Sequence, residues 1–532
     1  MFQVPIIHFS GTQKSRKASP HRAEVDNFTN ECHIAFVVGE HLYLDDGLYQ
    51  TFGGQALSNL SHNTDTYSID LSKSWRPVDA TLRKIAKEDA PNTWRQAYFL
   101  DSTSSTVYCW GGFAPKAPSR TLLSRFAADG DGGGSWSTET SLGYDGLADI
   151  ERSHGGAVAN TPDAGFYFGG VREDTDKAGP NKFISGYMQF NFKAENKTWV
   201  TYNDSRYSPS RTLYAASAHY VPNFGIKGLI MIFGGSEYDS ASSAGEPLSM
   251  ETIWFLDPVT HEWHSQKTSG DPPARRRWPC TVGAPGANHT YEIFLYGGNN
   301  LNPEPSFSEV YILSLPGFVW KRADSPPRNG TARTFMACAR AGKRQMITVG
   351  GRDIAERPTL AADVFPKGLG IFDLTELRWK DEYDAGAAEY DSPQVIKSWN
   401  LAKVRYDAGV EAIFTQNQPL SNPSFTSEPK EKPLLAGVIA GVVVGSVSLV
   451  ALAIAAAFFL RRRRRQRAQD ASPAANERDE VPKPSPTELS TTSYVYELPL
   501  KQQNTELSGH DARYDTVELD ASTTFQDSRK YN

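Results

Sequence analysis

Short apolar runs that end in a pair of glycines recur along the first 351 residues of this chain. Each run is followed by a segment in which apolar and polar residues alternate, and then by a tryptophan. The copies recur about every 61 residues, whereas the gap from glycine to tryptophan stays between 22 and 29 residues. The chain is therefore predicted to be a structural repeat whose length variation lies mostly in the loops after the tryptophan.

Six copies of the pattern are present, and each supplies the same two kinds of marker residue. The glycines that end the apolar runs are Gly47, Gly111, Gly112, Gly169, Gly170, Gly234, Gly235, Gly297, Gly298, Gly350 and Gly351. The tryptophans are Trp75, Trp136, Trp199, Trp263, Trp320 and Trp379. In the first copy, LYLDDG, Asp46 stands where the other copies have the first glycine of the pair.

The alternation predicts four strands per copy. Two strands precede each glycine pair, as in HIAFVV and HLYLDD of the first copy, and two follow it, the last at the tryptophan. A single sheet of this kind has two apolar faces that it cannot bury alone, so the copies must pack around an axis. Glycine suits a sharp turn near that axis, and tryptophan supplies apolar bulk between adjacent sheets.

These residues resemble the kelch repeat, and the resemblance covers residues 33–381. Three segments are similar to the single-pass kelch-repeat membrane proteins of filamentous fungi: RQMITVGG at 344–351, GLGIFDLTELRWKDEYDA at 368–385 and YDSPQVI at 390–396. The resemblance implies an all-β kelch β-propeller with six blades. Seven blades remain the alternative, because residues 390–415 contain apolar runs that would suit a closing strand. Asp46 departs from the repeat and is expected to weaken one turn.

A membrane span is expected at residues 434–460, which form an uncharged apolar run of 27 residues. A basic run, 461–465, follows it directly, so the positive-inside rule places the C-terminus in the cytosol and the repeats outside the cell. Gly437, Gly441 and Gly445 are spaced to share one helix face, which suits dimerisation through the membrane helix; glycine is also common in such helices for other reasons.

The predicted organisation is an N-terminal segment at 1–32, the propeller at 33–415, a juxtamembrane linker at 416–433, the span at 434–460 and a disordered cytoplasmic tail at 461–532. All sequons for N-glycosylation precede the span, at Asn27, Asn59, Asn196, Asn203, Asn288 and Asn329. The N-terminal segment shows no clear signal peptide. Either the N-terminus is incomplete or the signal is truly absent, and the second case leaves the topology open.

Composition and charge narrow the class of partner. The 532 residues include 55 basic and 61 acidic side chains, a net charge of −6, so nucleic acid is not expected as a partner. Among the four cysteines, Cys280 and Cys338 fall on the first strands of adjacent blades. They either form a disulfide in an oxidising compartment or remain buried thiols.

No catalytic, cofactor or metal site is predicted, so the chain is not expected to be an enzyme. Copper radical oxidases similar to galactose oxidase share the kelch repeat, but their site needs a late histidine pair, and after His289 the next histidine is His510. His261, Glu262 and His264 lack the spacing of a zinc helix and are interpreted as a solvated hairpin. The Arg275–Arg277 triplet is interpreted as a solvated loop, with contact to an acidic ligand as the alternative.

The tail offers one short motif. Tyr514 and Val517 fit the Tyr-x-x-apolar pattern of endocytic sorting signals, although generic disorder is the default interpretation of such a segment. The sequence favours a single-pass surface protein whose propeller binds a protein or glycan ligand outside the cell and whose tail serves anchoring or signalling. The first alternative is an intracellular or endomembrane scaffold, and the second is an enzyme of unrecognised type on the propeller face.

Overall fold

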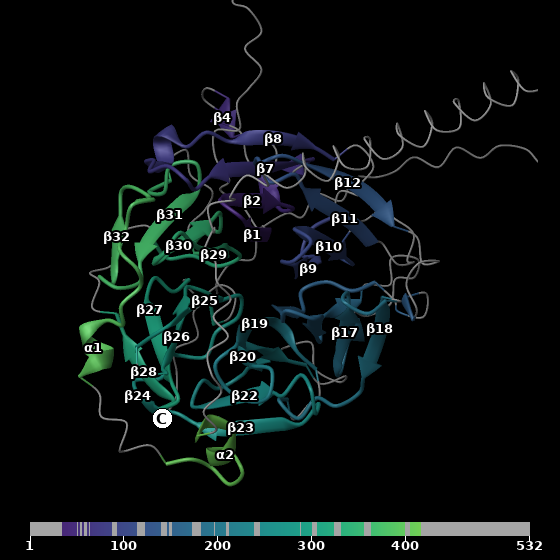
Figure 1. The fold of residues 1–532 in the computed structure, drawn as a ribbon, viewed down its shortest axis with the longest axis vertical. Helices are drawn as coiled ribbons and strands as arrows, with labels where there is room; N and C mark the ends of the chain where they lie inside the picture. Colours follow the sequence, from purple (N-terminus) through teal and green to yellow (C-terminus); the bar gives the residue numbers. More distant parts are fainter. Residues whose placement is uncertain are drawn as a thin grey trace, which may run out of the picture. The chain divides into compact units, whose positions relative to one another are not determined.

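Six antiparallel sheets, each built around four strands, are arranged about a common axis (Figure 1). The computed structural model describes residues 34–49, 52–53, 56–57, 61–62, 64–87, 93–113, 123–139, 146–147, 150, 152–172, 182–195, 197–208, 212–238, 245–287, 289–300, 306–323, 331–355, 363–398 and 405–415. All of them belong to one unit, Met1–Lys430. The all-β propeller predicted from the repeat is confirmed, with six blades.

Strands follow one another outward from the axis in sequence order within every blade. Blade 1 contains β1 (Ile34–Val38), β2 (His41–Asp45), β7 (Asp65–Asp70) and β8 (Arg83–Ala86), and blade 2 contains β9 (Ala97–Asp101), β10 (Thr106–Trp110), β11 (Leu123–Ala128) and β12 (Gly134–Glu139). Blade 3 contains β13 (Ala157–Asn160), β14 (Gly165–Phe168), β17 (Tyr187–Asn191) and β18 (Thr198–Tyr202). Blade 4 contains β19 (Tyr214–Val221), β20 (Leu229–Glu237), β22 (Thr252–Leu256) and β23 (Trp263–Lys267). Blade 5 contains β25 (Cys280–Pro285), β26 (Tyr291–Tyr296), β27 (Val310–Leu315) and β28 (Val319–Arg322), and blade 6 contains β29 (Ala337–Ala341), β30 (Gln345–Val349), β31 (Leu369–Asp373) and β32 (Arg378–Lys380).

Short strands and helices lie outside the four main strands of each blade. They are β3 (Leu48–Tyr49), β4 (Phe52–Gly53), β5 (Ala56–Leu57), β6 (Ser61–His62), the 3-10 helix η1 (Pro77–Asp79), β15 (Val171–Arg172), β16 (Lys182–Phe183), β21 (Glu246–Pro247), β24 (Ser269–Gly270) and the helices α1 (Gln394–Lys397) and α2 (Glu411–Thr415). Of these, β21 extends blade 4 by pairing with β20, and β24 extends blade 5 by pairing with β28 in parallel.

The hydrophobic core lies between the blades, because both faces of each sheet are apolar. Five of the six tryptophans lie on fourth strands and pack toward the preceding blade. Trp199 of blade 3, for example, lies 5.6 Å from Phe99 of blade 2 between ring centroids, and Trp379 of blade 6 lies 5.0 Å from Tyr296 of blade 5. The six core clusters thus join each blade to its neighbour rather than filling one central core.

Trp75 is the exception among the tryptophans. The sequence places it on a fourth strand, but the fourth strand of blade 1 is β8, and Trp75 lies in the connection before it. There it pairs with Tyr383, which follows the last strand of blade 6, through backbone N···O distances of 3.1 and 2.8 Å. Trp75 therefore helps to close the ring between blades 6 and 1.

The described parts of 390–415, namely 390–398 and 405–415, contain no strand, and the sheets form six blades rather than seven. These parts form α1 and α2, which lie at the periphery in Figure 1. Ile396 next to the end of α1 joins the core of blades 5 and 6, and Phe414 of α2 joins that of blades 4 and 5.

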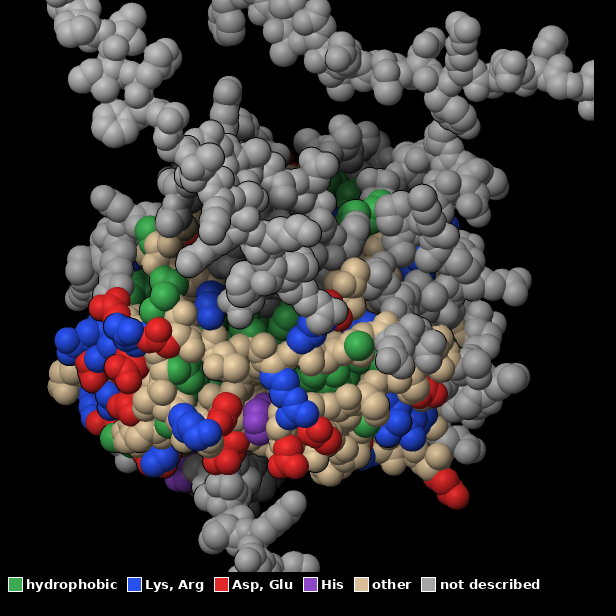
Figure 2. Space-filling view, turned by 90° about the horizontal axis from the view of Figure 1, so that it is seen from above, with side chains coloured by type: hydrophobic (Ala, Val, Ile, Leu, Met, Phe, Trp, Pro, Cys, Tyr) green, Lys and Arg blue, Asp and Glu red, His purple; other side chains and the backbone are tan. Residues whose placement is uncertain are grey.

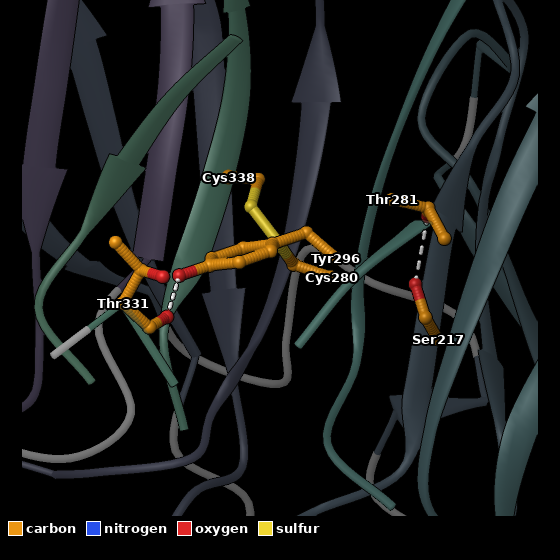
Figure 3. The surroundings of a disulfide bond; sticks show 6 residues. All are labelled: Ser217, Cys280, Thr281, Tyr296, Thr331 and Cys338. Carbon is orange, nitrogen blue, oxygen red and sulfur yellow. Dashed lines mark hydrogen bonds between the residues drawn. A yellow bond between two sulfur atoms is a disulfide. The ribbon is translucent and has the colours of Figure 1, made fainter. Parts of the chain in front are cut away.

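A disulfide joins Cys280 of β25 to Cys338 of β29, with their Cα atoms 5.7 Å apart (Figure 3). Of the two interpretations that the sequence left open, the structure has the disulfide. Figure 3 also shows the hydroxyls of Ser217 and Thr281 hydrogen-bonded at 2.8 Å, which links the first strands of blades 4 and 5. First strands are thus tied together at two successive interfaces.

The expected membrane span at 434–460, with Gly437, Gly441 and Gly445, lies outside the described residues, as does the tail with Tyr514 and Val517. Within the part of the chain that the structure describes, no helix is both long enough and apolar enough to cross a membrane. Membrane attachment therefore stays a prediction from the sequence.

Candidate ligand-binding face

The glycine pairs end the second strands, at the end of the propeller where the chain passes from one blade to the next. In blades 2 to 5, the first glycine of each pair lies against the backbone of the next blade. A Cβ atom on Gly111 would lie 2.5 Å from the carbonyl oxygen of Ser153, and one on Gly297 would lie 2.5 Å from that of Arg333. Both glycines have positive φ, at 76° and 65°. They are therefore sites of close approach between blades as well as turns.

The second glycine supplies a hydrogen bond to the same neighbour. The N–H groups of Gly112, Gly170, Gly235 and Gly298 donate to the carbonyl oxygens of Ser153, Leu213, Arg276 and Arg333, respectively, at 2.7–2.9 Å. A side chain on the first glycine would push this carbonyl away and break the bond. The pair thus fixes the spacing between blades at this end of the axis.

A ring of left-handed residues lies at or near the start of the first strands at the same end. Its members come from blades 2 to 6 and are Arg95, Gly155, Ala215, Trp278 and Phe335, with φ between 53° and 69°. Backbone bonds run around the ring from Gly155 to Arg95, from Ala215 to Gly155 and from Trp278 to Ala215. This backbone arrangement turns the side chains of Arg95, Trp278 and Phe335 toward the axis.

Those side chains meet across the axis. The guanidinium of Arg95, from blade 2, lies 5.1 Å from the ring of Trp278 in blade 5 and 5.8 Å from that of Phe335 in blade 6. Arg95 also donates to the hydroxyl of Tyr214 in blade 4 at 2.9 Å. We call Arg95, His154, Tyr214, Trp278 and Phe335 the central cluster. All except His154 are partly exposed, so the cluster presents aromatic rings and a guanidinium to a ligand.

The central cluster is electropositive at its buried side. Burial, together with the nearby charges of Arg95 and Arg152, lowers the pKa of His154 to about 3. His154 is therefore neutral at physiological pH, and the positive charge of the cluster comes from the arginines. The rings of Phe113 and Tyr214 pack against His154 at 5.7 and 6.4 Å between centroids.

Arg276 corrects the interpretation of the Arg275–Arg277 triplet as a solvated loop. Arg276 is only 1% exposed, donates to the carbonyl oxygen of Gly297 at 3.0 Å and stacks on Phe307 at 4.1 Å. It also donates to the carbonyl oxygen of Ala274 at 2.9 Å, and because its other partners, Gly297 and Phe307, belong to blade 5, it is a structural residue. Arg275 is exposed and Arg277 is partly exposed.

In blade 1, an acidic residue occupies the position of the first glycine in this turn. Asp46 takes the first-glycine position with φ 60°, and its carboxylate accepts a long bond of 3.4 Å from the N–H of Gln96 in blade 2. The adjacent Asp45 pairs with buried Lys87 at 2.7 Å. The predicted weakening of the turn is not visible in the backbone, which keeps its left-handed conformation because a carboxylate replaces part of the contact to the next blade.

Asp46 should make stability depend on pH. Burial raises the pKa of its carboxyl to about 8, although the charge of Lys87 opposes the shift. Because the pKa is raised in the folded state, the protonated carboxyl contributes to the free energy of unfolding. This contribution is fully present below the unfolded pKa of about 4 and is lost as the pH rises through about 8, with a slope of at most ~1.4 kcal/mol per pH unit. Asp46→Asn, which tolerates positive φ, should remove this slope.

The measurement is urea unfolding of the wild type and of Asp46→Asn at pH 5, 6.5 and 8. Because all other titrating groups are shared, the difference between the two curves isolates Asp46. Parallel pH profiles would show that the carboxyl does not titrate in this range.

The opposite end of the propeller is partly covered by the segment that follows blade 6. In the β19–β20 hairpin, the N–H of Gly225 donates to the carbonyl oxygen of Ile413 at 3.3 Å, and the ring of Phe224 packs against that of Phe414 at 4.7 Å between centroids. Near α1, Tyr390 donates to the buried carboxylate of Glu292 at 3.2 Å. The end that carries the glycine pairs and the central cluster is therefore the better candidate for ligand binding.

The rim offers no comparable feature. On the face shown in Figure 2, acidic and basic side chains are interspersed, without a broad patch of one sign among the described residues. Charges of opposite sign also pair within blade 6, where Arg344 contacts Asp373 and Glu376 at 3.0 and 2.7 Å. The mixed charges on this face do not favour binding of a nucleic-acid phosphate backbone.

Comparison with known proteins agrees with the fold. No family model matches the chain. A kelch repeat-containing protein of Arthroderma benhamiae (strain ATCC MYA-4681 / CBS 112371) is 24% identical over 505 residues, which cover 79% of this chain and 73% of the relative. This chain is a six-bladed propeller with a kelch-repeat homologue. The resemblance drawn from the glycine pairs and tryptophans is confirmed, and kelch propellers are typically protein-binding modules rather than enzymes.

Few of the other predicted site residues fall on described positions. Asn203 is exposed just after β18, which suits a glycosylation acceptor. Asn27, Asn59, Asn196, Asn288 and Asn329 lie outside the described residues. Glycosylation stays a prediction at all six.

The H-E-W-H motif lies in the β22–β23 hairpin and at the start of β23. Both ring nitrogens of His261 are hydrogen-bonded to tyrosine hydroxyls, Nδ1 to Tyr187 at 2.9 Å and Nε2 to Tyr202 at 3.2 Å. Across the described ranges, no three His, Cys, Asp or Glu side chains are grouped so as to hold a metal ion. His261 acts as a bridge between blades 3 and 4.

Proposed function

We propose that this chain is a single-pass membrane protein whose kelch propeller binds a protein or glycan ligand outside the cell, with a tail used for anchoring or signalling. The observation that carries the binding role is the central cluster, because tryptophan, tyrosine and arginine side chains are the ones that contribute most at binding sites. Loops from all blades surround this end, which suits recognition of a large partner.

Three observations support the extracellular placement. The disulfide between Cys280 and Cys338 favours an oxidising compartment. The six sequons precede the apolar run at 434–460, and the basic run follows it. Glycosidase treatment combined with protease protection on intact cells tests the placement, with tags at both ends of the chain. A glycosylated, protease-accessible propeller and a protected C-terminal tag are expected; an unglycosylated, protected propeller would favour the intracellular scaffold instead.

The binding role is tested by proximity labelling on cells that express the full-length chain. We expect the double variant Arg95→Ala/Trp278→Ala to lose the labelled partners, because a residue of either type at a binding centre typically contributes ~2 kcal/mol or more, a loss of about 30-fold or greater. The control is Arg378→Ala on the outer strand β32. Loss of partners in the control as well, or retention in the double variant, would contradict a role for the central cluster.

A further inference from the structure

A pocket of about 230 Å³ opens in blade 4 beside the central cluster. Tyr207 contributes from the connection between blades 3 and 4, and Arg275 from the connection between blades 4 and 5. The pocket joins the central cluster through consecutive residues: Glu237 lines the pocket, and the next residue, Tyr238, accepts a hydrogen bond from Arg277 and packs 6.1 Å from Tyr214 between ring centroids.

Hydrogen bonds hold the walls of the pocket in place without a ligand. Strand β21 pairs with the end of β20, and its Pro247 carbonyl oxygen accepts from Arg275 at 3.2 Å. On the other side, the hydroxyl of Ser208 donates to Glu237 at 2.7 Å, and that of Tyr207 donates to the carbonyl oxygen of Gly186 at 2.8 Å. The polar groups are therefore preorganised, which lowers the entropic cost of binding.

The lining combines four kinds of group around a small space. Trp254 offers a partly exposed aromatic ring, Glu237 a carboxylate that accepts, Arg275 a guanidinium that donates, and Ser249 and Thr252 two hydroxyls that do both. Ile232 and Leu248 add apolar surface. We infer that the pocket binds one neutral hexose ring of a glycan, with its C–H face toward Trp254 and its hydroxyls toward Glu237 and Arg275.

Charge balance favours a sugar over a peptide side chain. A cationic side chain would pair with Glu237 but meet the like charge of Arg275, and an acidic one would have the reverse problem. A neutral ring with several hydroxyls donates to Glu237 and accepts from Arg275 at once. The volume agrees, because drug-sized ligands need ~300–1,000 Å³, so this pocket suits a single ring of a longer chain that continues over the central cluster.

This inference rests on the proposed binding function and specifies its ligand class. The test is saturation-transfer NMR on the full-length chain with glucose, galactose and mannose and their linear oligomers as probes, and with hexalysine and hexaglutamate as peptide probes. We expect one hexose series to bind and both peptides to fail. Glu237→Gln and Trp254→Ala should each weaken that binding at least tenfold, whereas Glu246→Gln, an exposed carboxylate on the adjacent strand β21, should leave it unchanged.

Trp254 also packs against the core of blades 3 and 4, so its variant is judged together with the nearly isosteric Glu237→Gln. Preference for either peptide, or equal binding by wild type and Glu237→Gln, would overturn the sugar site. If no sugar binds while the central-cluster variant still loses its labelled partners, the pocket inference fails and the proposed function stands. If the wild type captures no partner and binds no sugar, both fail.

Discussion

Gly111→Ala should destabilise the propeller by about 3 kcal/mol or more. Forcing alanine to a left-handed conformation costs ~1–2 kcal/mol by itself. The new Cβ would also lie 2.5 Å from the carbonyl oxygen of Ser153, so the backbone of the next blade must move, and the hydrogen bond from Gly112 to that oxygen is lost. Urea unfolding of the variant and the wild type measures the difference.

Gly39→Ala is the matched control for this prediction. Gly39 has a positive φ of 58° in the hairpin of blade 1, but an added Cβ there would meet no atom within 4 Å. It should therefore cost only the ~1–2 kcal/mol of the backbone conformation. Equal losses in the two variants would show that the turn, rather than the close approach between blades, explains the glycine at position 111.

Removal of the disulfide should lower the free energy of unfolding by about 2–4 kcal/mol. Cys280 and Cys338 are 58 residues apart, and a cross-link that closes a loop of this size restricts the unfolded chain substantially. The double variant Cys280→Ala/Cys338→Ala should melt at a lower temperature than the wild type. A reducing agent should lower the wild-type melting temperature toward that of the variant.

Two controls accompany the disulfide experiment. The reducing agent should leave the double variant unchanged, because its cross-link is already absent. Cys109→Ala removes a buried thiol that is free, and the reductant should still act on this variant. A wild type that melts at the same temperature with and without reductant would indicate that the two cysteines are not joined in solution.

The fold could be predicted from the sequence because the same marker residues recur in every copy of the repeat. Glycine pairs and tryptophans mark each blade in order, and consecutive strands pair with each other, so local patterns carry the topology. The spacing of Trp75 matches that of the other tryptophans and predicts a place on a fourth strand. The structure moves it into a connection, because the contact that holds it is with Tyr383, more than 300 residues away.

The central cluster could not be predicted from the sequence. Its residues stand one per blade at positions of different chemistry, and only the backbone ring brings Arg95 within reach of Trp278 and Phe335. The signal that was available is the chain segment around the start of each first strand. The burial of Arg276 could not be predicted for a related reason, since the carbonyl oxygen of Gly297 and the ring of Phe307 that cover it come from later parts of blade 5.

The way the ring closes also affects how the chain folds as it is made. Each blade is one continuous stretch, so its sheet can form as soon as its own segment leaves the ribosome. The face of blade 1 that carries Leu42 and Leu44 packs against Ile347 and its neighbours in blade 6. At ~5–20 residues per second, the ~300 residues between them take roughly 15–60 s to synthesise. During that time this apolar face of blade 1 stays uncovered by blade 6. We expect a chaperone to bind the nascent chain there.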